Sequence, residues 1–177
     1  MTQQRNELCK CGSGKKFKVC CMITEREKQA KTNGECFTPL SLVNEMLDKL
    51  PKDVWKDPSK TYIDPAAGNG NFIIEVIKRK ILKYHHLPLQ AIYTTYGIEL
   101  MQDNVDECKK RIINFLKESF ADYGMAISCH GCLMMGITSK MWWNNVNRIL
   151  NHHIKCADAL KWNFDTWNGE GQIPMWI

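Results

Sequence analysis

A turn of small residues between two apolar runs constrains this chain more than any other feature. Residues 64–72 read Asp-Pro-Ala-Ala-Gly-Asn-Gly-Asn-Phe. They follow the apolar pair Tyr62-Ile63 and lead into residues 72–77, Phe-Ile-Ile-Glu-Val-Ile, which are typical of a helix. A strand that ends in an acid, then a small-residue turn and a helix, allows the backbone to approach a bound cofactor. Gly68 and Gly70 would give that access, although many such turns use glycine for its backbone freedom alone.

The spacing of the two glycines does not match the common phosphate-binding signatures. It does not fit G-x-G-x-x-G, and no Lys-Ser/Thr pair follows the glycines as in a P-loop. Residues 64–72 instead resemble the first motif of class I S-adenosylmethionine-dependent methyltransferases, in the D-P-A-x-G-x-G-x-F form of the adenine-N6 DNA methyltransferases of restriction systems. The resemblance implies an α/β, Rossmann-like fold with a mostly parallel sheet and S-adenosyl-L-methionine as cofactor. It assigns cofactor binding to Asp64, Ala66, Gly68, Gly70, Asn71 and Phe72.

A second motif of that family precedes the turn. Residues 37–39 read Phe-Thr-Pro and are followed by apolar residues at helical spacing, Leu40, Val43, Leu47 and Leu50. The pattern predicts a helix with Thr38 as its N-cap and Pro39 as its first helical residue. In the family this motif packs near the methionine end of the cofactor, so the resemblance adds Phe37, Thr38 and Pro39 to the cofactor site. A capped helix start with no further role is the alternative.

Two later acids each follow an apolar run. Residues 96–100, Tyr-Gly-Ile-Glu-Leu, look like the second strand, and Glu99 would accept hydrogen bonds from ribose hydroxyls. Residues 154–160 resemble the third strand, whose terminal acid meets the adenine amino group in the family; Asp158 takes that place. Because the carboxyl ends of adjacent parallel strands line one crevice, we expect these acids and Asp64 to converge on one cationic, phosphate-free ligand.

The connections between the predicted strands are longer than usual. The first is longer than the usual twenty or so residues, and we expect its extra length to form a loop around His85, His86 and Pro88. After Glu99 a helix is predicted, with Asp103 as its cap and apolar residues at Val105, Cys108, Ile112, Phe115 and Leu116. The following insertion, residues 117–152, has no assigned role and contains a predicted helix at about 140–150.

The insertion contains residues that metal or nucleic-acid sites also use. Cys129 and Cys132 could bind a second metal with His130 or with the later pair His152-His153, but a single C-x-x-C pair fits buried free thiols better. Trp142 and Trp143 could stack on a base, but aromatic residues near Val146, Ile149 and Leu150 are more often part of a core.

The amino-terminal region contains four cysteines, Cys9, Cys11, Cys20 and Cys21, in a C-x-C-x8-C-C spacing. Four thiols among too few residues for a core indicate a Zn²⁺ centre that supplies the folding energy. The region resembles the SEC-C module, which implies that all four cysteines are zinc ligands and that Gly12 and Gly14 form the tight turn between the pairs. Disulfides in a secreted miniprotein are the alternative, but no hydrophobic signal segment is present.

Charge and composition divide the chain into two parts. Residues 1–34 hold eight Lys and Arg against three Asp and Glu, whereas residues 35–177 hold sixteen of each, so the formal charge of +5 belongs to the amino-terminal part. That part could contact nucleic acid or an acidic protein surface, or form a solvated face. The predicted organisation is a SEC-C-like zinc module at 1–24, a linker at 25–34 and a methyltransferase domain at 35–177. No apolar stretch is long enough to cross a bilayer, so a cytoplasmic protein is expected.

One motif of the family has no counterpart in the sequence. Adenine-N6 methyltransferases orient the target amine with an Asn/Asp-Pro-Pro-Tyr/Phe loop, and no such tetrapeptide occurs here. We therefore expect a carboxy-terminally incomplete methyltransferase domain and assign no catalytic residue.

The resemblance implies the cofactor-binding part of a site-specific DNA adenine-N6 methyltransferase of a restriction-modification system. Such a part would be either cut short by a gene break or made active by a second polypeptide, and it would transfer methyl to an extruded adenine only if the missing loop were supplied. The alternative is a non-catalytic S-adenosylmethionine-binding adaptor that uses its zinc module to bind a partner. A methyltransferase for protein or a small molecule is a third interpretation.

Overall fold

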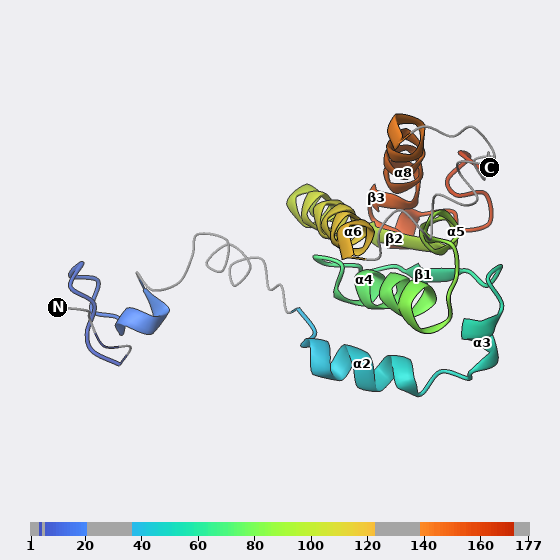
Figure 1. Ribbon diagram of the computed structural model, residues 1–177. Coiled ribbons are helices and arrows are strands. Elements are labelled where there is room, and N and C mark those ends of the chain that lie inside the picture. Colours follow the sequence, from blue (N-terminus) through green and yellow to red (C-terminus); the bar gives the residue numbers. More distant parts are fainter. Residues whose placement is uncertain (1–3, 5, 21–36, 123–138, 172–177) are drawn as a thin grey trace. The chain divides into compact units, whose positions relative to one another are not determined.

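The computed structural model describes residues 4, 6–20, 37–122 and 139–171, and the chain divides into two compact units, Met1–Phe37 and Thr38–Ile177 (Figure 1). The second unit is a mixed α/β structure (Figure 1). The elements in chain order are the 3-10 helix η1 (Phe17–Val19), α2 (Leu40–Asp48), α3 (Asp53–Lys56), β1 (Tyr62–Asp64), α4 (Asn71–Lys78), the π-helical turn η2 (Arg79–Lys83), α5 (Pro88–Tyr93), β2 (Thr95–Glu99), α6 (Gln102–Asp122), α8 (Ser139–His153), β3 (Ile154–Cys156) and the 3-10 helix η3 (Ala159–Lys161).

The first unit contains a small hairpin. Leu8 pairs antiparallel with Lys16, and the N–H of Cys9 donates to the carbonyl of Lys15 at 2.7 Å. Between these residues Gly12 and Gly14 have positive φ angles of 79° and 70°, which L side chains rarely adopt. The turn between the cysteine pairs therefore requires glycine at both places.

The second unit is built on a three-stranded parallel sheet in the order β1-β2-β3. The parallel arrangement confirms the sequence prediction. β2 is the central strand, and its residues Thr95, Tyr96, Gly97 and Ile98 are buried, as expected for a strand covered on both faces. In open parallel sheets of this kind, ligands bind in the crevice outside the carboxyl ends of the strands.

Helices cover the two sheet faces unequally. The main core joins α4, α5, α6 and α8 to the face that carries Ile154 and Tyr62. On the opposite face Tyr96 and Ile98 pack against Trp167, whose indole N–H donates to the carbonyl of His152 at 2.7 Å. Figure 1 shows α6 and α8 beside β3.

Several sequence predictions about these helices need correction, while one is confirmed. Pro88 is the first residue of α5 rather than part of a loop, because a proline at the helix start loses no hydrogen bond. Asp103 lies inside the first turn of α6, which begins one residue earlier. The helix expected at about 140–150 is α8, and Trp142 within it is buried in the core, as predicted. The Cys129–Cys132 segment lies outside the described residues.

The start of α2 also differs from the prediction. Pro39 is its N-cap, its carbonyl accepting from the N–H of Val43 at 3.0 Å, and Thr38 precedes the cap. Val43 and Leu47 are buried with Trp55 and Val76, whereas Leu40 and Leu50 are 47% and 38% exposed. The buried stripe of α2 is therefore narrower than its apolar pattern suggested. Within the described ranges, no helix combines the length and apolarity needed to cross a membrane.

A buried lysine joins the strand starts. The ammonium of Lys80 is within 3.2 Å of the carbonyls of Lys60 and Thr94 and the hydroxyls of Thr94 and Thr95. The side chain is 2% exposed, and burial lowers its pKa to about 8. The segment before β1 is thereby tied to the start of β2.

This lysine predicts a pH dependence of stability. The folded-state pKa lies below the ordinary 10.5, so the folded chain releases this proton first as pH rises. Stability should therefore increase between pH 8 and 10.5, by roughly 2 to 4 kcal/mol, and Lys80→Met should lack this increase. Chemical denaturation of both proteins at pH 7.5 and 10.5 measures the difference, and tyrosine ionisation cancels in the comparison. Lys49→Met, at the exposed lysine that follows α2, is the control and should keep the increase.

Candidate cofactor and metal sites

The turn after β1 is held tightly against two neighbouring elements. The N–H of Ala67 donates to the carbonyl of Ile98 in β2 at 2.9 Å, and the N–H of Gly70 donates to Ala67 at 2.8 Å. Gly68 and Gly70 have positive φ angles of 53° and 86°. A Cβ at Gly70 would clash with the thiol of Cys108 in α6. Gly70 is thus required both by its backbone angle and by the close approach of α6.

The three predicted acids stand at the carboxyl ends of adjacent strands. Asp64 pairs with Gly97, two residues before Glu99, and Glu99 pairs with Cys156, two residues before Asp158. Because side chains alternate along a strand, positions two apart share a face. Asp64 and Glu99 therefore lie on the same side of the sheet, one step apart, whereas Asp158 follows the end of β3 beyond the bend at Ala157.

Glu99 is bonded to the glycine turn itself. Its Oε2 accepts from the N–H of Gly68 at 2.8 Å, and its Oε1 accepts from the N–H of Met101 at 3.0 Å. The carboxylate thus fixes the turn after β1 and the chain entering α6. A carboxylate has about four acceptor positions, so Glu99 retains capacity for hydroxyl donors.

The surroundings of Asp64 disfavour the ionised form of its carboxyl group. Burial raises the pKa of its carboxyl group, the hydrogen bond from the N–H of Ala66 at 3.1 Å opposes this, and the nearby Glu99 raises the pKa further. Two carboxylates share this region, and a cationic or hydrogen-bond-donating ligand would stabilise both.

Asp158 has a different setting. Its Oδ1 accepts from the N–H of Leu160 at 3.0 Å and caps η3, while Lys161 lies 3.3 Å from its Oδ2. Asp158 therefore acts as a helix cap in this structure. An adenine amine at Asp158 would share the carboxylate with these partners.

Of the other residues predicted to bind the cofactor, some lie at the glycine turn and others do not. The carbonyl of Thr38 accepts from Nδ2 of Asn71 at 2.8 Å, which brings Thr38 to the glycine turn. Phe72 packs in the cluster around Val43 and Val76. Ala66 is exposed, and Phe37 belongs to the first unit.

Two residues near the turn were missed by the sequence reasoning. Oδ1 of Asn69 is buried and has no hydrogen-bond partner among the described residues. Arg111 donates from Nη1 to the carbonyl of Asn69 at 2.7 Å and to Oδ1 of Asn71 at 2.8 Å. No local pattern marks Arg111, because only the packing of α6 brings it to the turn.

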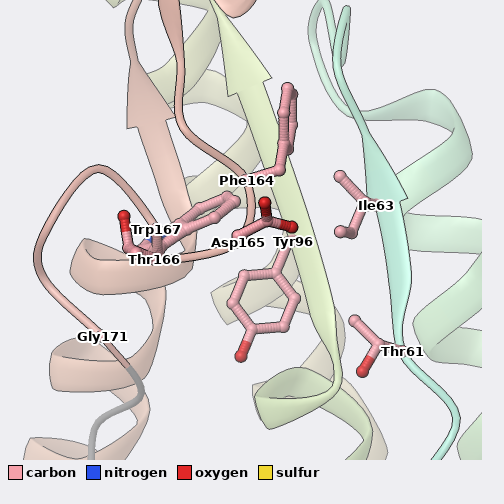
Figure 2. A pocket seen from close by; sticks show the side chains of 8 residues that line it. All are labelled: Thr61, Ile63, Tyr96, Phe164, Asp165, Thr166, Trp167 and Gly171. Carbon is pink, nitrogen blue, oxygen red and sulfur yellow. The ribbon is translucent and has the colours of Figure 1, made fainter.

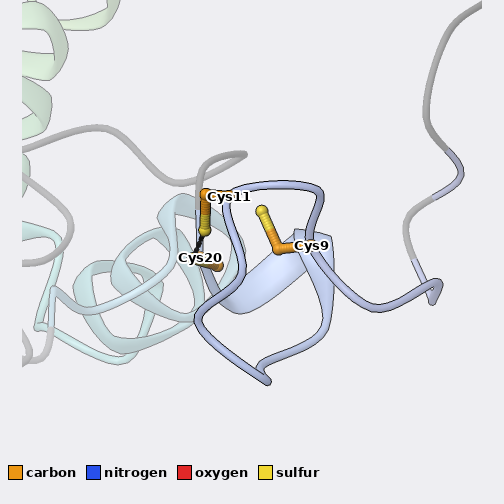
Figure 3. Close-up of side chains that lie close together, drawn as sticks. All are labelled: Cys9, Cys11 and Cys20. Atoms are coloured by element: carbon orange, nitrogen blue, oxygen red, sulfur yellow. Dashed lines mark hydrogen bonds between the residues drawn. The ribbon is translucent and has the colours of Figure 1, made fainter.

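Three of the four predicted metal ligands lie together. Figure 3 shows the side chains of Cys9, Cys11 and Cys20 close to one another, and their sulfur atoms all lie within 4.8 Å. Hydrogen bonds from the side chain and backbone of Ser13, and then from Cys20 and Cys9, lower the pKa of Cys11 to about 6. A thiolate is the form that binds metal. Cys21 lies outside the described residues.

A separate hollow of about 130 Å³ lies on the opposite face of the sheet (Figure 2). It is lined by Thr61, Ile63, Tyr96, Phe164, Asp165, Thr166, Trp167 and Gly171. Ile63 and Tyr96 alternate with Asp64 and Gly97 along their strands, so the hollow lies on the face opposite Asp64 and Glu99.

Comparisons with known proteins give two matches. A sequence model described as SEC-C motif matches residues 5–23, and one described as N-6 DNA Methylase matches residues 21–117, more than half of the chain. The first range contains all four cysteines predicted as metal ligands, and the second contains Asp64 and Glu99 but not Asp158. No curated protein and no solved structure matches the chain.

The tight packing at Gly70 predicts a large cost for a methyl group there. Gly70→Ala should destabilise the protein by about 2 to 4 kcal/mol, because it adds backbone strain and a clash with Cys108. Gly169→Ala is the matched control, since Gly169 has a φ of 85° but no atom within 4 Å of the added Cβ. It should lose only about 1 kcal/mol in thermal unfolding. Equal losses in the two variants would contradict the close approach of α6.

The raised pKa of Asp64 predicts a stability gain on neutralisation. Because the folded-state pKa is raised, the ionised carboxylate destabilises the folded chain at neutral pH. Asp64→Asn should therefore raise the melting temperature at pH 7, and the gain should disappear below about pH 4, where the unfolded carboxyl group is also protonated. Melting curves at pH 3.5, 5 and 7 measure this, and a gain that persists at pH 3.5 would exclude the electrostatic cause.

Proposed function

The chain belongs to the N-6 DNA methylase family, and from this membership we propose that residues 35–177 form the S-adenosyl-L-methionine-binding part of a site-specific DNA adenine-N6 methyltransferase. In this proposal the sheet is part of a Rossmann-like domain, residues 25–34 are a linker and residues 1–24 are a zinc module. The observation that carries the proposal is the bond between the carboxylate of Glu99 and the backbone of Gly68. It assembles an acid and a glycine turn at the carboxyl ends of adjacent parallel strands, where open α/β sheets bind ligands.

The residues of the site fit the proposed cofactor chemically. S-adenosyl-L-methionine carries an amine, ribose hydroxyls and a cationic sulfur, and the site offers carboxylates at Asp64, Glu99 and Asp158. The raised pKa of Asp64 indicates a place where a cation would be stabilised. The buried Oδ1 of Asn69 offers a further acceptor. When bound, the cofactor supplies a methyl group activated by its sulfonium.

The other residues of the proposed site are backbone and packing elements. Gly68 and Gly70 expose the turn, and Thr38 and Pro39 approach it through the bond to Asn71. Phe72 supports the turn from the hydrophobic cluster below it. With Phe37 and Ala66, these residues complete the set that we assign to the cofactor.

One sequence motif bears on how a target adenine would be oriented. The amine nitrogen must be turned toward the methyl group by hydrogen-bond acceptors, and the 177 residues contain no Asn/Asp-Pro-Pro-Tyr/Phe tetrapeptide. We therefore propose that DNA methylation requires a further polypeptide segment that supplies these acceptors, and we assign no catalytic residue.

The cysteine cluster fits a structural zinc site. Zn–S bonds of about 2.3 Å in a tetrahedron place sulfur atoms about 3.8 Å apart, and the three sulfur atoms lie within 4.8 Å of one another. Cys9, Cys11 and Cys20 would hold Zn²⁺ together with Cys21. The metal supplies the folding energy that so short a segment lacks.

A second candidate function is a cofactor-binding adaptor without methyl transfer, in which the zinc module engages a partner. The lack of the adenine-orienting tetrapeptide favours it. Methyl transfer from labelled cofactor to unmethylated DNA separates the two functions. Transfer that appears after a polypeptide with the missing loop is added supports the methyltransferase, while cofactor binding without transfer under both conditions supports the adaptor.

Substitutions at the two sites should have separate effects. Glu99→Ala should weaken S-adenosyl-L-methionine binding by about 10- to 100-fold, because charge-assisted hydrogen bonds contribute roughly 1.5 to 3 kcal/mol, and should leave the zinc content unchanged. Cys20→Ser should lower the zinc content and leave cofactor affinity unchanged. Calorimetry and metal analysis measure both, and Glu45→Ala, at an exposed acid of α2, is the control for charge. Unchanged affinity in Glu99→Ala would refute the assigned site.

A further inference from the structure

Three segments far apart in the sequence meet through one asparagine. Asn71, the first residue of α4, donates from Nδ2 to the carbonyl of Thr38 at 2.8 Å. Its Oδ1 accepts from Nη1 of Arg111 at 2.8 Å, and the same nitrogen donates to the carbonyl of Asn69 at 2.7 Å. The separations along the chain are 33 and 40 residues for the two bonds of Asn71. We name this set of bonds the Arg111–Asn71 bracket.

The bracket fixes which way the amide of Asn71 faces. Both N–H groups of Nη1 are directed at oxygen atoms, so the oxygen of the amide must face Arg111 and its nitrogen must face Thr38. A reversed amide would place N–H groups against the guanidinium and an oxygen against the carbonyl of Thr38. One donor–donor contact and one acceptor–acceptor contact would then replace two hydrogen bonds. Arg111 therefore selects the amide orientation in which Asn71 donates to Thr38.

We infer that Asn71 and Arg111 are positioning residues that set the distance between the Thr38–Pro39 segment and the glycine turn, and that they act on cofactor affinity without a role in zinc binding. This inference rests on the proposed function, since both linked segments belong to the proposed cofactor site. Arg111 acts through Asn71 and through the carbonyl of Asn69, both of which flank Gly70.

One variant separates geometry from charge. Asn71→Asp keeps an oxygen for Arg111 but has no N–H for Thr38, so it breaks the bracket at one bond. Its added negative charge would by itself favour a cationic ligand. The added charge alone would strengthen binding, so weaker binding in this variant would be due to the lost hydrogen bond to Thr38. We expect S-adenosyl-L-methionine affinity to fall about three- to tenfold, the range for one neutral hydrogen bond.

Arg111 offers a graded test. Arg111→Met should also weaken binding, and Arg111→Lys should restore part of the affinity, because lysine keeps the charge and a donor but lacks the planar fork. Lys109→Met is the matched control, since Lys109 lies on the same helix and donates to Oδ1 of Asn151 at 3.1 Å, away from the turn. It should leave cofactor affinity unchanged.

The measurements are calorimetric affinity for S-adenosyl-L-methionine and S-adenosylhomocysteine, melting temperature, and hydrogen exchange across α2. The expected result is weaker binding of both nucleosides and faster exchange near Thr38 in Asn71→Asp, with a melting temperature close to that of the wild type. If the wild type binds the cofactor and Asn71→Asp binds it with the same affinity, the inference is overturned while the proposed function stands. A wild-type chain that binds neither nucleoside overturns both.

Discussion

The bond between Glu99 and the backbone of the glycine turn is the interaction on which the site depends. One carboxylate accepts from Gly68 and Met101, so a single side chain fixes the connection leaving β1 and the connection leaving β2. Charge-assisted bonds of this kind are short and strong. They place the backbone of the turn at the ends of two strands, which parallel pairing alone does not do. A ligand bound at this edge would meet backbone that these bonds already hold in place, which would lower the ordering cost of binding.

The same region contains several unfavourable local features, and the helical core offsets them. Asp64 carries a charge that burial and Glu99 disfavour, Asn69 has a buried oxygen without a partner among the described residues, and Gly70 lies under α6 at positive φ. Strain of this kind persists where the surrounding structure fixes the conformation. Here that structure is the core of α4, α5, α6 and α8, in which residues such as Ile73, Ile112 and Ile149 are almost fully buried.

The sequence predicted what short-range patterns determine. The strand, turn and helix at residues 62–78 follow from local composition, and the cysteine cluster follows from thiols close together in the chain. Features that depend on packing between distant segments were not predictable in this way. Lys80 is buried because the strand starts surround it with carbonyl and hydroxyl oxygens, and Arg111 reaches the turn because α6 crosses it. Thr38 was expected to cap α2, but Pro39 is the N-cap, and the carbonyl of Thr38 accepts a hydrogen bond from the distant Asn71.

The position of β1 at the edge of the sheet bears on where a target base would enter. Among the described residues β1 pairs with β2 alone, and Ile63 on its outer face is 42% exposed. Edge strands present unpaired backbone groups that favour pairing with another segment. A strand added in parallel at this edge would end beside Asp64, because parallel strands bring their carboxyl ends to the same side. Acceptors for an adenine amine carried on such a strand would face the same crevice as the acids, so the cofactor and the target could be held by adjacent strands from different segments.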